Sequence, residues 1–145
     1  MFKKILVPVD GSETAWRALN NALEIGKKFE SEILVVNVIQ PYNNAALLAV
    51  PLDHATINQG NSELEKVGDK VLELAKEMDG SFPHKVEYDM EVGHPSERII
   101  ALSKKVEADA IVLGSRGLSG IAEFFLGSVS SKVSQYATVP VLIVK

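Results

Sequence analysis

The alternation of short apolar runs with segments of helical periodicity limits the fold of this chain more than any other feature. Four runs are almost continuously apolar, at residues 5–9, 32–39, 109–113 and 139–144. Such runs are typical of strands buried on both faces, as in a parallel sheet. A fifth run, 85–92, alternates apolar and charged residues, which favours a half-exposed edge strand. The sequence therefore predicts an open α/β fold, a five-stranded and mostly parallel sheet with helices on both faces.

Four helical segments connect the predicted strands. Ser12 is expected to cap the first helix, and Asp79-Gly80 to end the second, which is predicted over residues 61–78. Pro95 suits the first position of the third helix, and the fourth begins after Gly127-Ser128. Residues 40–60 are expected to form a long irregular connection, and such connections are usually functional or mobile. The expected buried faces of the helices are, in chain order, Trp16, Leu19, Leu23, Gly26; Leu64, Val67, Val71, Leu74, Ala75, Met78; Ile99, Ile100, Leu102; and Val129, Val133, Tyr136.

Composition and charge narrow the class of protein. The length fits one domain over residues 1–145, large enough to bury about 68–70% of its unfolded surface. The absence of cysteine excludes disulfides, thiolate metal sites and cysteine nucleophiles. A net charge of −4 without a basic block argues against nucleic acid as a partner. No signal peptide and no apolar run of membrane-spanning length are present, so we expect a soluble, cytoplasmic protein without a membrane partner.

The glycine-rich stretch after the fourth strand carries the strongest functional signal. It contains Gly114, Gly117, Gly120 and Gly127-Ser128, and a helical pattern follows. Glycine lets the backbone approach an anion closely, and the N–H groups of a loop and of a helix start can bind phosphate. The spacing is not that of a Walker loop, and a dinucleotide fingerprint would follow the first strand. A plain connection is the alternative, but it would usually be about 2–6 residues long.

The spacing Gly114-x2-Gly117, nine residues, then Gly127-Ser128 resembles the nucleotide-binding signature of the universal stress protein family, in its ATP-binding branch. The opening 5–12, the turn 93–95 and the ending 140–144 are also similar to the family's pattern, so the resemblance covers essentially the whole chain. It implies an adenine-nucleotide alpha-hydrolase-like fold, doubly wound, with strand order 3-2-1-4-5. The residues alone leave the order 2-1-3-4-5 open.

The resemblance also implies where an adenine nucleotide would bind. Ligands of open α/β sheets bind beyond the carboxyl ends of the strands, where the strand order reverses. There, the adenosine would be bordered by Pro8, Val9, Asp10 and Val38, and the ribose and phosphates by Gly114, Ser115, Arg116, Gly117, Gly127, Ser128, Val129 and Ser130.

Four side chains of this set also have a plainer interpretation. Asp10 could be an ordinary turn carboxylate, Val38 a core residue, Ser128 a helix cap and Arg116 a solvated side chain. The implied ligand is ATP, with Mg²⁺. Glu123 lies in a run where the family often carries lysine or arginine, so AMP or ADP could compete with the triphosphate.

The sequence contains few residues in a pattern that indicates catalysis. His54, His84 and His94 lack the spacing of metal ligands, and no acid–base pair or activated nucleophile stands out, so no catalytic or metal-binding residue is assigned. A response-regulator receiver domain would need an acidic cluster after the first strand, where Asp10 stands alone. We expect a nucleotide-dependent regulator or interaction module in a stress response, with an unidentified protein partner. A slow ATPase or phosphotransferase and a nucleotide-free structural dimer are the alternatives.

The last apolar run, 139–144, is expected to be an edge strand in either strand order. An uncovered apolar edge has unpaired N–H and C=O groups and can pair with its own copy in a two-fold homodimer. Pro140 removes one donor, so the contact should centre on Val141, Leu142 and Ile143. A monomer with this edge covered is the alternative.

Overall fold

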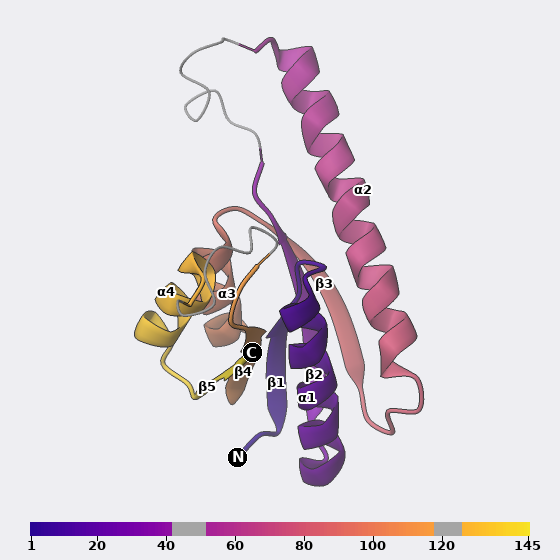
Figure 1. The fold of residues 1–145 in the computed structure, drawn as a ribbon, viewed down its shortest axis with the longest axis vertical. Coiled ribbons are helices and arrows are strands. Elements are labelled where there is room, and N and C mark those ends of the chain that lie inside the picture. Colours follow the sequence, from indigo (N-terminus) through magenta and orange to yellow (C-terminus); the bar gives the residue numbers. More distant parts are fainter. Residues whose placement is uncertain (42–51, 118–125) are drawn as a thin grey trace.

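The computed structural model describes residues 1–41, 52–117 and 126–145, which form a five-stranded parallel sheet flanked by helices (Figure 1). The strand order is β3-β2-β1-β4-β5, so the order 3-2-1-4-5 is confirmed and 2-1-3-4-5 is excluded. In chain order the elements are β1 (Lys4–Pro8), α1 (Glu13–Phe29), β2 (Glu32–Ile39), α2 (His54–Asp79), β3 (Val86–Val92), α3 (Pro95–Lys105), β4 (Ala110–Gly114), α4 (Ser128–Tyr136) and β5 (Val141–Val144).

The strand order reverses between the two central strands, β1 and β4. Leu6 of β1 pairs with Leu34 of β2 on one side and with Ile111 of β4 on the other. From β1 the chain continues outward to β2 and β3, and it then returns through α3 to β4. The connections after β1 and after β4 therefore leave the sheet toward opposite faces, and this opens a crevice at their carboxyl ends.

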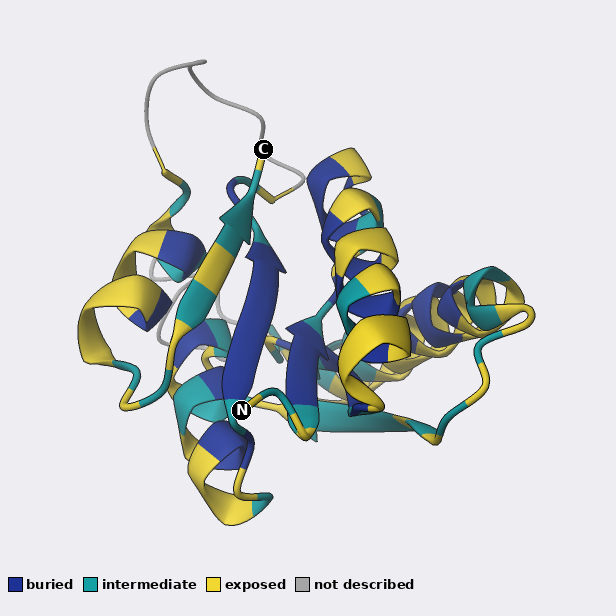
Figure 2. Cartoon of the chain, turned by 90° about the horizontal axis from the view of Figure 1, so that it is seen from below, coloured by how far each residue is buried: buried dark blue, intermediate teal, exposed yellow. Residues whose placement is uncertain are grey.

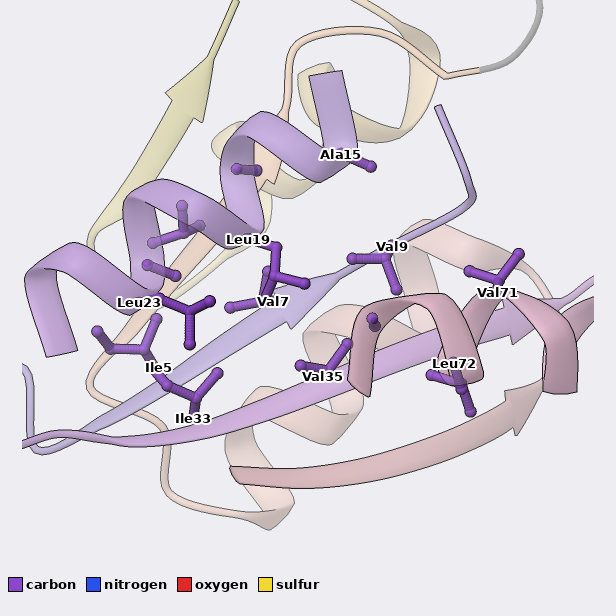
Figure 3. Packing of buried hydrophobic residues seen from close by; sticks show 14 residues of the cluster. Ile5, Val7, Val9, Ala15, Leu19, Leu23, Ile33, Val35, Val71 and Leu72 are labelled. Atoms are coloured by element: carbon purple, nitrogen blue, oxygen red, sulfur yellow. The ribbon is translucent and has the colours of Figure 1, made fainter. Parts of the chain in front are cut away.

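Two hydrophobic cores lie on the two faces of the sheet. Successive strand residues point to opposite faces, so Ile5 and Val7 pack under α1 and α2 while Leu6 packs under α3 and α4. Figure 3 shows the first core, where Leu19 and Leu23 of α1 lie over β1 and β2. In Figure 2 the central strands are buried along their length, whereas β5, which ends at the C label, is mixed.

The start of α2 corrects the sequence prediction. The helix begins at His54 rather than residue 61, because the Asp53 carboxylate caps it and accepts the Thr56 N–H at 2.8 Å. The irregular connection is correspondingly shorter, and its residues 42–51 lie outside the described part of the chain. The first turns of α2 project beyond the sheet (Figure 1).

The buried face of α2 is also partly different from the predicted one. Val67 and Leu74 are 60% and 43% exposed, while Gly68 and Leu72 are buried. At Gly68 the helix approaches β2 so closely that a Cβ atom would lie 2.7 Å from Asn37 Oδ1. α2 therefore contacts the sheet through this glycine. Glycine has no side chain, so the periodicity of apolar side chains does not identify it as a contact residue.

The remaining helix predictions largely hold. Ser12 Oγ caps α1 by accepting the Ala15 N–H, and Pro95 opens α3. Tyr136 is wrong as a buried residue, since it is the last residue of α4 and 61% exposed. Val92, at the end of β3, is exposed. β3 and β5 are the two edge strands, as predicted.

Among the described helices, none combines the length and apolarity that crossing a membrane requires.

Candidate functional site

A cavity of about 200 Å³ lies at the crevice between the carboxyl ends of β1 and β4. Its wall is formed by residues that follow these two strands, by the end of β2, and by the starts of α1, α3 and α4. The predicted site residues that line it are Pro8, Val9, Asp10, Val38, Gly114, Arg116, Gly117, Gly127, Ser128, Val129 and Ser130. The structure therefore brings together residues that are up to 122 positions apart in the sequence, from Pro8 to Ser130.

Much of the cavity wall is apolar and includes residues that the sequence analysis missed. These are Ala15, Val36, Pro95, Ile99 and Leu113. Val36 and Leu113 resemble ordinary core residues of central strands, and no local signal distinguishes them. Pro95 and Ile99 could have been found, because Pro95 ends the turn at 93–95 that already carried the family resemblance and Ile99 lies one helical turn after it.

The chain leaves β1 in a conformation fixed by three hydrogen bonds. Val9 N–H donates to the Val36 carbonyl at 2.8 Å, and Asn37 Nδ2 donates to the Val9 carbonyl at 2.8 Å. Asp10 Oδ1 then accepts the Ser12 N–H at 2.9 Å, an Asx turn that leads into α1. Asp10 is thus the turn carboxylate of the plainer interpretation, and it also lines the cavity.

Ser115 is the one predicted site residue that does not line the cavity. It is buried, and its N–H donates to the Val144 carbonyl at 2.8 Å. Its carbonyl accepts the Gly127 N–H at 2.7 Å and the Ser130 hydroxyl at 2.8 Å. Ser115 therefore joins β4, β5 and α4, and it holds the two described ends of the glycine-rich stretch together.

The three described glycines of the stretch differ in what a side chain would meet. At Gly114 an added Cβ would lie 2.6 Å from Thr14 Oγ1 and 2.8 Å from the Thr14 carbonyl carbon, so this glycine permits close packing against α1. At Gly127 the nearest atom would be the Ser115 carbonyl oxygen, at 3.3 Å. At Gly117 it would be Asp10 Oδ2, at 2.9 Å, the end of an exposed side chain across the cavity mouth.

The start of α4 directs backbone donors toward the cavity. Gly127 is the N-cap residue, so Ser128 is not the helix cap. The first bond of the helix runs from the Ser131 N–H to the Gly127 carbonyl at 2.9 Å. The N–H groups of residues 128–130 precede this bond and have no acceptor in the described chain. Such a helix start attracts anions through both its free donors and its dipole.

Arg116 supplies the positive charge at the cavity. Its side chain is partly buried and lines the wall, and it makes no ion pair with any described residue. Glu123 and Gly120 lie outside the described residues. Within the described residues, no three histidine, aspartate or glutamate side chains are grouped as metal ligands. His94 occupies the N-cap position of α3 without a side-chain bond to the helix backbone; its Nδ1 lies 3.1 Å from Ser96 Oγ, and it is not part of the cavity wall.

Comparison with known proteins identifies chains that are similar to this one in sequence and in fold. Universal stress protein YxiE of Bacillus subtilis is 37% identical over 150 residues, and the match covers both chains completely. The solved structure of MJ0577 of Methanocaldococcus jannaschii, named a universal stress protein, is 30% identical with a TM-score of 0.81, over 100% of this chain and 96% of that one.

Two further solved structures share the fold at 24% identity. One is a universal stress protein in complex with cAMP, with a TM-score of 0.73 over 99% of this chain and 97% of the other. The second is a family member from Arabidopsis thaliana with AMP bound, with a TM-score of 0.69 over 99% and 91%. The model of the universal stress protein family matches residues 1–145, and this chain therefore belongs to that family.

Proposed function

We propose that this protein binds an adenine nucleotide, with ATP as the expected ligand, in the cavity between β1 and β4. The observation that carries the proposal is the convergence of unpaired donors on a cavity whose wall is otherwise largely apolar. Family members described with cAMP and with AMP bound support the choice of adenine nucleotides. Nucleotide occupancy would then regulate binding to a protein partner during stress.

The phosphates would lie at the end formed by the glycine-rich stretch and α4. The N–H groups of Ser128, Val129 and Ser130 and the Arg116 guanidinium provide donors of suitable charge. Ser130 would contribute its N–H rather than its hydroxyl, because that hydroxyl already contacts the Ser115 and Gly127 carbonyls. Ser128 keeps an exposed hydroxyl that can donate to a phosphate oxygen.

The base would lie against the apolar wall and meet the exposed backbone of Val38. The Glu32 N–H donates to the Lys3 carbonyl, and the Val36 carbonyl accepts the Val9 N–H. The backbone N–H and C=O groups of the even-numbered residues of β2 therefore point toward β1. Beyond Val9 the chain has left the sheet, and the N–H and C=O of Val38 face the opened crevice. One donor beside one acceptor can pair with the N1 and N6 edge of adenine. Asp10 Oδ2 is placed to accept from a ribose hydroxyl.

The cavity favours binding over rapid turnover. Arg116 is the one cation of the described wall, and none of the described wall residues is a histidine or lysine that could act as a base. Mg²⁺ would bind mainly through the phosphates and water, as is usual for this ion. AMP and ADP would retain the contacts to the base and to the first phosphate, so they should compete with ATP.

Calorimetry on nucleotide-stripped protein tests the proposal. We expect one site per chain for ATP, competition by AMP and ADP, and weaker binding of GTP, whose base edge reverses the donor and acceptor. Mass spectrometry of the denatured protein should identify any adenine nucleotide retained through purification. Equal binding of ATP and GTP would contradict the assignment of the base site, and no binding at millimolar ATP would contradict the function.

We further propose that β5 forms a two-fold homodimer by pairing with its copy. Leu142 is 43% exposed on this edge, and β5 carries no charged residue. The other edge, β3, is less suited, because it carries charges and the Asp89 carboxylate already accepts the Met90 N–H at 2.8 Å. Sedimentation should give a dimer that Leu142→Lys with Val144→Lys shifts toward monomer. A wild-type monomer at micromolar concentration would contradict this interface.

A further inference from the structure

The Thr14 hydroxyl lies behind the cavity wall and contacts the glycine-rich stretch. Thr14 is in the first turn of α1, and 9% of the residue is exposed. Its Oγ1 donates to the Arg116 carbonyl at 2.6 Å, across 102 residues of sequence. The Ser12 hydroxyl is 3.4 Å from the same carbonyl and already accepts the Ala15 N–H, so Thr14 makes the stronger contact.

This contact fixes the direction of the next backbone donor. The peptide bond between Arg116 and Gly117 is trans and planar, so its C=O and N–H point in opposite directions. With the carbonyl turned to Thr14, the Gly117 N–H points away from α1. The Gly117 nitrogen lies beside the start of α4, since a Cβ added to Gly127 would be 3.7 Å from it. No described residue accepts this N–H.

We propose that Thr14 is a positioning residue that aims the Gly117 N–H at the phosphates of a bound nucleotide. The inference rests on the proposed function of the cavity, and Thr14 itself is not part of the wall. With the hydroxyl in place, the Gly117 N–H joins the donors of residues 128–130. Without it, the Arg116 carbonyl keeps only the longer contact with the Ser12 hydroxyl, 3.4 Å away, and the peptide can turn that oxygen toward the anion, which it would repel.

The packing around Gly114 is consistent with this role. A Cβ on Gly114 would lie 2.6 Å from Thr14 Oγ1, so the absence of a side chain there leaves room for the hydroxyl. Gly114 thus allows α1 to approach β4, and Thr14 uses that approach to hold the following peptide. Neither residue needs to touch the ligand.

The test compares Thr14→Val and Thr14→Ala, which remove the hydroxyl, with Thr14→Ser, which keeps it. Calorimetric affinities are measured for ATP and for adenosine, which has no phosphate. Thr14→Val should weaken ATP binding roughly tenfold, because a donor to a charged group is lost. It should change adenosine binding less than about twofold on the same grounds, because no base or ribose contact involves Thr14. Thr138→Val, at an exposed threonine before β5, is the matched control and should change neither.

The Thr14→Ser variant and the Gly117 amide resonance give two further readouts. Thr14→Ser should restore the ratio of ATP to adenosine affinity, and the Gly117 amide resonance should shift with ATP in wild type and Thr14→Ser but not in Thr14→Val. If Thr14→Val is unstable, the pair Thr14→Ala and Thr14→Ser isolates the hydroxyl. Equal losses for ATP and adenosine, or no loss, would overturn this inference alone. No ATP binding by the wild type would overturn it together with the proposed function.

Discussion

Two polar regions of the molecule differ in how their groups are paired. The α2–β3 corner consists of Asp79, Lys85, Glu87 and Tyr88, and each of these side chains has a partner within it. The Tyr88 hydroxyl donates to Asp79 Oδ2 at 2.6 Å, and Lys85 Nζ lies 2.7 Å from Glu87 Oε1. Burial and the neighbouring Asp79 carboxylate raise the pKa of Tyr88 above its usual range. The polar groups of this corner therefore stabilise the fold by pairing with one another.

The cavity shows the opposite arrangement. The Arg116 guanidinium and the N–H groups of Gly117 and of residues 128–130 have no acceptor among the described residues. Free donors grouped around a cavity suit an anionic ligand, and this group forms the proposed phosphate site. Changes at the corner should therefore affect stability, whereas changes at the cavity mouth should affect binding.

Gly117→Val should give the largest effect, and on binding alone. The side chain would enter the cavity mouth beside Asp10, where an added Cβ meets no backbone atom closely. We expect ATP affinity to fall by about a hundredfold or more, corresponding to roughly 2.7 kcal/mol, with the free energy of unfolding nearly unchanged. Calorimetry and urea unfolding measure the two quantities.

A matched substitution checks that the effect is local. Gly60→Val places the same side chain at a glycine of α2 that is not part of the cavity wall, and ATP affinity should be unchanged. If Gly117→Val folds and still binds ATP with wild-type affinity, the cavity mouth is not the phosphate site.

Gly114→Ala should combine both kinds of effect, because Gly114 lies between the wall and α1. The methyl group would collide with the Thr14 backbone, which cannot move without displacing α1. Overpacking of this kind typically lowers stability by about 1–3 kcal/mol. Urea unfolding should show this loss, with weaker ATP binding in the folded fraction. A stability equal to wild type would contradict the close approach of α1 to β4.

Tyr88→Phe should give the smallest effect, and on stability alone. It removes the hydrogen bond to Asp79 but keeps the ring, at a cost of about 1 kcal/mol in the free energy of unfolding. ATP affinity should stay at the wild-type value. A loss of ATP binding in this variant would remove the distinction between the two regions.

The raised pKa of Tyr88 adds a pH dependence with a defined sign. A tyrosine whose pKa is higher in the folded than in the unfolded state stabilises the fold fully below the ordinary value of about 10. This contribution is lost as the pH rises above that value, because the unfolded chain releases the proton first. Urea unfolding between pH 8 and pH 11 should therefore show a steeper loss in wild type than in Tyr88→Phe. Parallel curves would contradict the assignment.

The sequence was sufficient for the strand layout and for most of the cavity wall. Buried parallel strands read as apolar runs, and β2 was predicted with its observed bounds, Glu32–Ile39. The glycine spacing located the side of the crevice that follows β4, because a phosphate loop must follow a strand and precede a helix, and the family resemblance located the side that follows β1. Family resemblance, rather than the residues themselves, selected the strand order that the structure has.

What the sequence could not supply depends on contacts between distant segments. Ser115 was predicted to be a nucleotide contact, yet its backbone N–H and C=O are bonded to Val144 and Gly127. No local sequence pattern indicates these bonds. Gly68 determines how α2 sits on β2, although periodicity favoured Val67. Thr14 showed no signal, since its partner is the Arg116 carbonyl and backbone carbonyls are present at every position.

Amide resonances followed during an ATP titration report which backbone N–H groups contact the nucleotide. The unpaired N–H groups at the cavity are expected to hold the phosphates. We expect the largest shifts at Gly117, Ser128, Val129 and Ser130, smaller shifts at Val38, and none at Tyr88. Adenosine should move Val38 but not the residues of α4. Saturating ATP that leaves Gly117 and residues 128–130 unshifted, or that shifts the α2–β3 corner instead, would contradict the account.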